Sequence, residues 1–373
     1  KYDVPVRAGW PAVLRSQTRV LDPLVPIELG AAFADGLMPA SLNVRMTVSA
    51  LPPIPFASAL KGALEYPYGC AEQTTSKGYA ALELDDSTAK LLGVPGLDAK
   101  KRRERMEGAF GRLASMQVSS GHFSMWGDDG YVSPGLTPYI VEFLLDAKEA
   151  GFAVPDNVLQ KALARLSEDL LAGGAQFYGS DKREHLKFAN QAYAGYVLSR
   201  VNRAPLGTLR ALYDNERGNS LTGLPLVHLG IALSQQGDKN RGRRSIDQGF
   251  VMKGGRPEYL GDYGTKLRDE ALMIALVHER KFGKHEYDTR VISLGRELDA
   301  RRNAGWMYLS TQEQVALARL GKALMVDQQK MVSGNFSLGD TTEAIAATKL
   351  FGRSFDYAAL ARGMRFVPEG QPP

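Results

Sequence analysis

The sequence has one cysteine and three tryptophans among its 373 residues, and no apolar run approaches the roughly 20 residues of a membrane-spanning helix. A single cysteine excludes a disulfide framework and any metal site built from several thiolates. With 44% hydrophobic residues, 39 Gly and 19 Pro, the composition is that of a globular protein, which excludes disordered and collagen-like chains. The length suits one large domain or two to three small ones.

The chain also lacks a strong excess of one charge, because 46 Lys and Arg against 41 Asp and Glu give a net charge of +5. Two basic clusters, 100–105 and 239–244, lie where we predict helices to begin, and no aromatic residues are interleaved with them. Nucleic-acid binding would need a continuous basic stripe and a reading element, so we interpret both clusters as solvated helix faces. The chain begins without Met or a signal-peptide pattern, which favours a piece of a longer protein whose targeting signal lies elsewhere.

Residues 56–327 carry the apolar period of helices, interrupted by short turns that contain Gly or Pro. Charged helices alternate with more apolar ones, and Gly-aromatic turns occur at 121–123 and 305–306. A polar outer helix paired with an apolar inner helix, repeated about six times, is typical of an α/α toroid, so the predicted fold class is mainly α. The predicted helices lie near 56–65, 70–92, 98–118, 136–150, 155–172, 187–201, 205–214, 221–236, 238–250, 264–282, 286–302 and 310–326.

Strand patterns appear at the two ends of the chain. Residues 41–48 alternate apolar and polar side chains, and prolines stop the strand shortly afterwards. Segments 335–338 and 364–367 also have the pattern of strands. We therefore expect one small β domain that is interrupted by a helical insertion, since the termini of an inserted domain usually lie close together. The expected divisions are 1–55 (β), 56–327 (helical) and 328–373 (β).

The chemistry concentrates at Tyr66-Pro67-Tyr68-Gly69-Cys70-Ala71-Glu72-Gln73-Thr74. The only cysteine follows Pro and Gly and opens a helical pattern. We predict Gly69 as N-cap, Cys70 as N1 and Glu72 as N3, where a carboxylate suits the unpaired N–H groups. Cys70 and Gln73 are three residues apart and would share one helix face. A thiolate stabilised by the helix N-terminus could attack the neighbouring carboxamide, release ammonia and leave an internal Cys–Gln thioester.

This motif, Gly-Cys-Ala-Glu-Gln, resembles the Gly-Cys-x-Glu-Gln thioester motif of the α2-macroglobulin and complement family. Further matching segments are 121–127 (Gly-His-Phe-Ser-Met-Trp-Gly) with 136–139, 305–306 with 310–313, and 263–269, which is similar to the bacterial branch. The resemblance covers about 56–327. It implies a thioester domain inserted into a β domain that this family calls CUB.

The resemblance implies a protease trap rather than an enzyme with turnover. A protease cuts a bait region elsewhere in the parent chain, and the exposed thioester then acylates a Lys amine of the attacker. Cys70 would leave as thiolate and Gln73 would supply the acyl carbon, with Gly69 and Glu72 in support and Tyr66 or Tyr68 as a shield over the bond. The implied partners are target proteases and other domains of the parent, with no cofactor, metal or nucleic acid. The implied location is the periplasm or cell envelope, and any lipid anchor would lie outside this sequence.

Other interpretations stay open beside this one. A lone cysteine is often a buried structural thiol, and Tyr66 and Tyr68 could be ordinary core aromatics. We expect Trp126 and Trp306 to be core residues. Some complement members use a histidine to redirect transfer to hydroxyls, and His185 is the candidate here, although its local sequence does not match the family pattern closely.

Two other classes of protein fit the predicted fold. Polysaccharide hydrolases and lyases also use α/α toroids, with paired acids as proton donor and base. Turn carboxylates could supply such a pair, but the sequence places no two of them together. The candidates are Asp128, Asp129, Asp262 and Asp269. An inactive binding scaffold of the same family is the third alternative.

Overall fold

The structure is a computed structural model. It describes residues 13, 15–22, 24–49, 62–64, 69–86, 97–127, 132–173, 175, 177, 181–252, 256–257, 260–282, 288–305, 308–327, 331–348 and 350–369. Most of the described secondary structure is helical, with small antiparallel sheets near the chain ends, so the mainly α fold class is confirmed. No described helix has the length and apolarity to cross a membrane. Contacts divide the chain into two compact units, which are described separately below.

The larger unit holds 55–286 and 309–324. Its helices begin where capping residues or prolines allow: Asp98, Asp238 and Thr265 each accept a hydrogen bond from the third residue that follows. The helices of this unit are α2 (Ala71–Glu83), α4 (Ala99–Met116), α5 (Leu136–Glu149), α6 (Asp156–Leu171), α7 (Arg183–Ser199), α8 (Leu206–Ala211), η3 (Leu212–Glu216), η4 (Arg217–Asn219), α9 (Gly223–Gln235), α10 (Lys239–Val251), α11 (Lys266–Glu279) and α13 (Thr311–Asp327).

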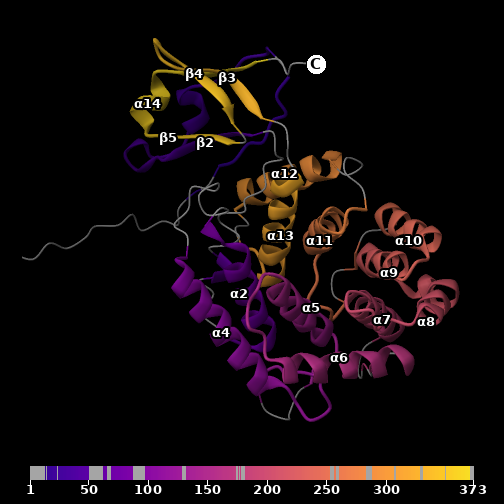
Figure 1. The fold of residues 1–373 in the computed structure, drawn as a ribbon. Coiled ribbons are helices and arrows are strands. Elements are labelled where there is room, and N and C mark those ends of the chain that lie inside the picture. Colours follow the sequence, from indigo (N-terminus) through magenta and orange to yellow (C-terminus); the bar gives the residue numbers. More distant parts are fainter. Residues whose placement is uncertain are drawn as a thin grey trace, which may run out of the picture. The chain divides into compact units, whose positions relative to one another are not determined.

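Within this unit the more apolar helices form an inner set. Helices α2, α5, α7, α9 and α11 pack on one another in succession, and α4, α6, α8 and α10 lie outside them (Figure 1). Helix α13 completes the inner set, because Arg319 binds Glu279 of α11 and Lys322 binds Glu83 of α2. Such a ring of inner helices is what an α/α toroid requires, and we retain the toroid as our interpretation of it.

A buried polar cluster lies where the inner helices meet. The guanidinium of Arg319 binds the carboxylates of Glu142 at 2.9 Å and Glu279 at 2.8 Å. The Tyr193 hydroxyl donates to Glu142, and the imidazole of His228 stacks on the Tyr193 ring. Three aromatic side chains complete the cluster: Tyr79, Tyr193 and His228. Each of the six inner helices contributes at least one of these side chains, so the cluster joins them all.

Helices α9 and α10 approach each other closely through glycines. A Cβ added at Gly230 would lie 2.6 Å from the carbonyl oxygen of Gly242, and one at Gly249 would lie 2.7 Å from the carbonyl oxygen of Gly223. Real Cβ atoms do not tolerate such distances, so these positions of α9 and α10 need glycine for the backbones to pack.

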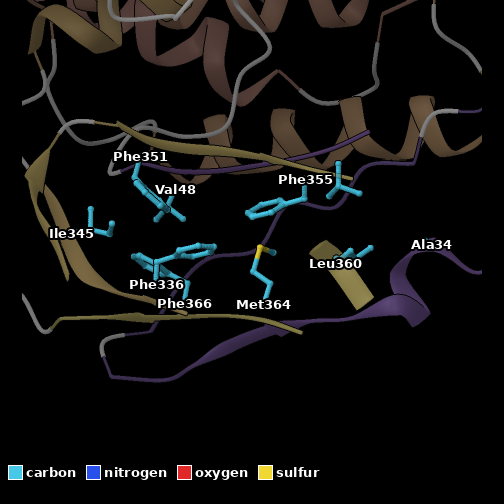
Figure 2. Close-up of a cluster of buried hydrophobic side chains, with 10 residues drawn as sticks. Ala34, Val48, Phe336, Ile345, Phe351, Phe355, Leu360, Met364 and Phe366 are labelled. Carbon is cyan, nitrogen blue, oxygen red and sulfur yellow. The ribbon is translucent and has the colours of Figure 1, made fainter. Parts of the chain in front are cut away.

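The smaller unit holds 1–54, 287–308 and 325–373. One sheet has the strand order β1-β6-β3-β4 and a second pairs β2 with β5, all antiparallel. A hydrophobic core that includes Phe336, Phe351 and Phe366 fills the space between the sheets (Figure 2). The elements are β1 (Ile27–Leu29), η1 (Ala31–Ala34), η2 (Pro39–Ser41), β2 (Val44–Ser49), α12 (Asp288–Asn303), β3 (Val332–Leu338), β4 (Thr341–Thr348), β5 (Leu350–Phe355), α14 (Tyr357–Ala361) and β6 (Met364–Pro368).

The unit boundaries differ from the expected domains at one place. The expected divisions at 55/56 and 327/328 lie close to the boundaries of the units, whereas 287–308 groups with the β segments. One cause is visible at Ser16, whose backbone N–H and C=O both bind the side chain of Asn303 in α12 at 2.9 Å. The assignment of the three ranges to domains stays a prediction.

Candidate functional site

The candidate site is the first turn of α2, where Cys70 and Gln73 cap each other. The backbone N–H of Gln73 donates to Sγ of Cys70 at 3.5 Å, and the backbone N–H of Cys70 donates to Oε1 of Gln73 at 3.2 Å. This is a capping box in which a thiol replaces the usual hydroxyl. The cap is therefore Cys70, and our prediction of Gly69 as N-cap, Cys70 as N1 and Glu72 as N3 was wrong by one residue. Extended backbone at Cys70 (φ −68°, ψ 173°) causes the shift, and it aims the sulfur at the N3 residue.

The turn is fixed on one side by the segment 121–127. The backbone N–H of Ala71 donates to the carbonyl oxygen of Met125 at 2.9 Å. That segment is held in turn by Phe123, which is fully buried, and by Gly121, whose φ of +94° and contact with Lys161 exclude a side chain. Residues 121–127 therefore support the N-terminus of α2 through backbone contacts.

The tryptophan of this segment is not a core residue. The side chain of Trp126 is 58% exposed, which contradicts our expectation. Trp306, for which we made the same prediction, lies outside the described residues. A large apolar side chain is not buried by its size alone. This turn contacts α2 through its backbone, so its tryptophan side chain is free to face solvent.

The turn is fixed on the other side by Glu72. Its buried carboxylate accepts hydrogen bonds from Ser76 at 2.7 Å, from Thr311 at 2.9 Å and from the side-chain amide of Gln312 at 2.8 Å. Thr311 and Gln312 are the first residues of α13, about 240 positions away in sequence. Sequence reasoning missed this link: it matched 310–313 to the family as a segment, but gave those residues no role.

The electrostatics at Cys70 differ from our expectation. Burial raises the pKa of the thiol, the hydrogen bond from Gln73 lowers it by less, and the charge of Glu72 raises it further. The side chain is 5% exposed. The sequence predicts a thiolate stabilised by the helix N-terminus. In the structure desolvation outweighs the helix, so the free thiol is protonated at neutral pH.

The histidine candidate, His185, makes its described hydrogen bond with a residue other than Cys70. His185 lies in the first turn of α7, is 2% exposed and accepts a hydrogen bond at Nδ1 from the backbone N–H of Leu221 at 3.1 Å. Burial lowers its pKa to about 4, and the charges acting on it are those of Asp262 and Arg256. No hydrogen bond or charge interaction described for His185 involves Cys70.

Two of the turn acids do come together, which we did not expect. Arg256 contacts both Asp262 and Asp269, and Arg268 does the same. The two positive charges neutralise the two carboxylates, as in a structural ion-pair cluster. Asp128 and Asp129 lie outside the described residues, as do the shield candidates Tyr66 and Tyr68. Among the residues that the structure covers, no group of three or more His, Cys, Asp or Glu side chains could hold a metal ion.

The arrangement brings one sulfur and one carboxamide together in a fixed, buried turn. A nucleophile and an acceptor on side chains held close together can react as an intramolecular pair, with a large gain over free solution. The arrangement is therefore compatible with acyl transfer from Gln73 to Cys70.

Comparisons with known proteins identify relatives of the whole chain. No protein-family profile matches the chain. Curated bacterial proteins named alpha-2-macroglobulin do match, among them the following two. That of Xylella fastidiosa strain Temecula1 is 64% identical over 373 residues, covering 100% of this chain and 23% of the relative. That of Escherichia coli K12 is 35% identical over 323 residues, covering 85% of this chain and 19% of the relative.

The chain belongs to the alpha-2-macroglobulin family.

Solved alpha-2-macroglobulins share its fold. The native E. coli protein superposes with a TM-score of 0.81 at 31% identity, covering 94% of this chain and 22% of that one. Salmonella alpha-2-macroglobulin reacted with methylamine gives 0.79 at 32%, covering 94% and 22%. E. coli alpha-2-macroglobulin activated by porcine elastase gives 0.66 at 31%, covering 94% and 31%. The chain thus spans about a quarter of the length of its alpha-2-macroglobulin relatives.

Proposed function

We propose that this chain carries the internal thioester of an alpha-2-macroglobulin-like protease trap. The observation that carries the proposal is the reciprocal capping of Cys70 and Gln73, because it folds both side chains back over the same helix turn, where the thiol and the carboxamide could react. To close the thioester, Sγ of Cys70 bonds to Cδ of Gln73 and the Cδ–Nε2 bond breaks. The thiol proton leaves with that nitrogen as ammonia.

Transfer to a target would run through the same carbon. An amine nitrogen bonds to Cδ of Gln73, the Cδ–Sγ bond breaks, and one amine proton passes to the sulfur of Cys70. The product is an amide and a free thiol, and the acyl group is consumed. The reaction therefore occurs once per molecule, as in a covalent trap rather than a turnover enzyme.

Three properties of relatives support the wider role. The chain matches proteins named alpha-2-macroglobulin over its whole length, one solved relative was reacted with methylamine and another was activated by porcine elastase. We infer proteases as targets, Lys amines as acceptors, and activation by cleavage elsewhere in the parent. Periplasmic location is part of the proposal, since a thioester caps a thiol that an oxidising compartment would otherwise modify.

The rival hydrolase or lyase interpretation has less support. It needs an acid and a base that are free to exchange protons with substrate, whereas Asp262 and Asp269 are both bound to Arg256 and Arg268. An inactive scaffold would keep the fold but not the thioester, so the same experiment separates it from the trap.

The test is the intact mass of the freshly purified chain before and after methylamine, with a thiol count at each step. We expect a starting mass that is lower by one ammonia and no titratable thiol. One methylamine should then add at Gln73 as one thiol appears. The variant Cys70→Ala should show neither change and should keep its helical dichroism, because losing a weak N-cap costs about 1 kcal/mol. A free thiol at the start, no amine uptake and an unchanged glutamine at position 73 would contradict the proposal.

A further inference from the structure

Glu72 sits between the two thioester residues in sequence, yet its side chain belongs to a different set of contacts. The carboxylate is buried and accepts from one hydroxyl on its own helix, Ser76, and from two donors on α13, Thr311 and Gln312. The Ser76 hydroxyl also lies 3.0 Å from the hydroxyl of Tyr139 in α5. Glu72 thus joins α2 to α13 directly, and Ser76 extends this network to α5.

We propose that Glu72 is a positioning residue for closure of the Cys70–Gln73 thioester, and that Thr311 and Gln312 hold it in place. This inference rests on the proposed function. Among the hydrogen bonds described for this turn, those of Glu72 join it to α13, and the opposite side of the turn is held through the backbone contact of Ala71 with Met125. Together these two ties fix the turn against both neighbours.

The start of α13 is itself braced, which makes it a rigid support. Ser310 and Glu313 form a reciprocal cap, with the Ser310 N–H donating to Glu313 at 2.9 Å and the Glu313 N–H donating to the Ser310 hydroxyl at 3.2 Å. The same Glu313 accepts from the hydroxyl of Thr265, the N-cap of α11, at 2.7 Å. Reacting groups held by such second contacts keep the geometry that a fast intramolecular reaction needs.

A positioning role and a purely electrostatic role predict opposite results for Glu72→Gln. The negative charge of Glu72 adds to the burial effect that keeps the Cys70 thiol protonated. Removing only the charge would therefore favour the thiolate and speed closure. Loss of the position that Glu72 gives the turn would slow closure, because the carboxamide of the variant presents an NH₂ group to a pocket of donors. We expect slower closure, on the order of tenfold.

The decisive comparison is between two substitutions at Thr311. Thr311→Ser keeps the hydroxyl donor, whereas Thr311→Val has nearly the same shape and lacks it. In the freshly purified 373-residue chain, we expect Thr311→Ser to contain the wild-type fraction of closed thioester. Thr311→Val and Glu72→Gln should contain a large fraction that never closed. Ser245→Ala is the matched control, because it removes a buried 2.7 Å bond from α10 to the Leu226 carbonyl of α9, away from the turn.

Peptide mass at position 73 gives a readout that general destabilisation does not imitate. A chain that never closed retains Gln73, whereas a chain that closed and then hydrolysed carries a glutamate there. We expect Gln73 in Thr311→Val and Glu72→Gln, with far-UV dichroism unchanged. Full closure in both folded variants, or glutamate at position 73, would overturn the inference. If Glu72→Gln fails to fold, the Thr311 pair decides. A wild-type chain that lacks the thioester and retains Gln73 would instead refute the proposed function, and this inference with it.

Discussion

Arg319 of α13 and Glu142 of α5 form an ion pair of 2.9 Å in which the side chains are 3% and 1% exposed. Burial alone would raise the pKa of Glu142, but the charges of Arg319 and Arg200 lower it to about 2. The carboxylate is therefore ionised in the folded chain at all ordinary pH values, and the guanidinium beside it stabilises this buried charge.

The first prediction concerns this pair. Arg319→Leu should lower the free energy of unfolding by about 3–5 kcal/mol, because it leaves a buried carboxylate without its partner. The double variant Arg319→Leu with Glu142→Leu should recover only part of the loss, because it removes the unpaired buried carboxylate but leaves Glu279 without Arg319 and the Tyr193 hydroxyl without its acceptor. Urea unfolding followed by far-UV dichroism gives both values. A double variant that is less stable than the single would contradict this view of the pair.

The inner helices could be predicted from sequence, but the cluster that joins them could not. The helical period and the Gly or Pro turns placed most helices within a few residues, since both signals are local. The Arg319–Glu142 pair spans 177 positions, and no local pattern indicates it. Strands β4 and β5 could not be predicted from the sequence either. In β4, one buried residue, Ile345, lies among exposed ones, so the strand shows no clear alternation.

At the candidate site, the sequence indicated that Cys70 and Gln73 lie on one helix turn, but it did not indicate the contacts that support this turn. Cys70 and Gln73 were found because the motif and the three-residue spacing are local. The register of the cap depends on the backbone of Cys70, which the sequence does not show, and the Glu72–Thr311 bond is a tertiary contact. The raised pKa of Cys70 could not be predicted either, because it comes from burial of the thiol in the folded chain and not from its place at a helix start.

The second prediction is an acid-dependent loss of stability that begins near neutral pH. Burial lowers the pKa of His228 to about 3. An unfolded histidine titrates near 6.5, so the unfolded state binds more protons below that value. The stability that neutral His228 provides is thus fully present above about pH 6.5, and it falls by up to about 1.4 kcal/mol per pH unit on the way to pH 3.

The substitution His228→Phe isolates this contribution. Phenylalanine keeps a flat ring beside Tyr193, whose centroid lies 4.1 Å from that of the imidazole, and it cannot take up a proton. Between pH 7 and pH 4, the free energy of unfolding should fall less steeply in the variant. The difference in slope should correspond to about one proton fewer taken up on unfolding. The same slope in both proteins would show that His228 is not the titrating group.

The third prediction is a pair of glycine substitutions with opposite signs. Gly230→Ala should destabilise by about 1–3 kcal/mol, because its Cβ would meet the carbonyl oxygen of Gly242 and force α9 and α10 apart. Gly108→Ala in α4 has open space around the new Cβ and should stabilise by about 0.5–1 kcal/mol through helix propensity. Thermal unfolding of the two variants checks both signs, and a stabilising Gly230→Ala would contradict the packing described for α9 and α10.

The fourth prediction concerns the thiol after methylamine has opened the bond. Because burial raises the pKa of Cys70, the folded chain should react with iodoacetamide more slowly than free cysteine at pH 7. The rate should climb as pH rises past about 8.5, the value for an ordinary thiol, and unfolding in urea should remove the difference. A fast reaction of the folded, opened chain at pH 7 would mean that the helix N-terminus, and not burial, controls the sulfur.

The fifth prediction is that conjugates are amides. Transfer to hydroxyls needs a base or nucleophile beside the thioester, because an unassisted alcohol is a poor nucleophile near neutral pH. His185 cannot readily supply one: its Nδ1 accepts from Leu221 and burial lowers its pKa to about 4. The chain should therefore acylate Lys amines on a protease and give adducts that resist hydroxylamine, with little ester formed on glycerol. His185→Ala should leave this ratio unchanged, and a dominant ester product that disappears in His185→Ala would make the histidine a participant.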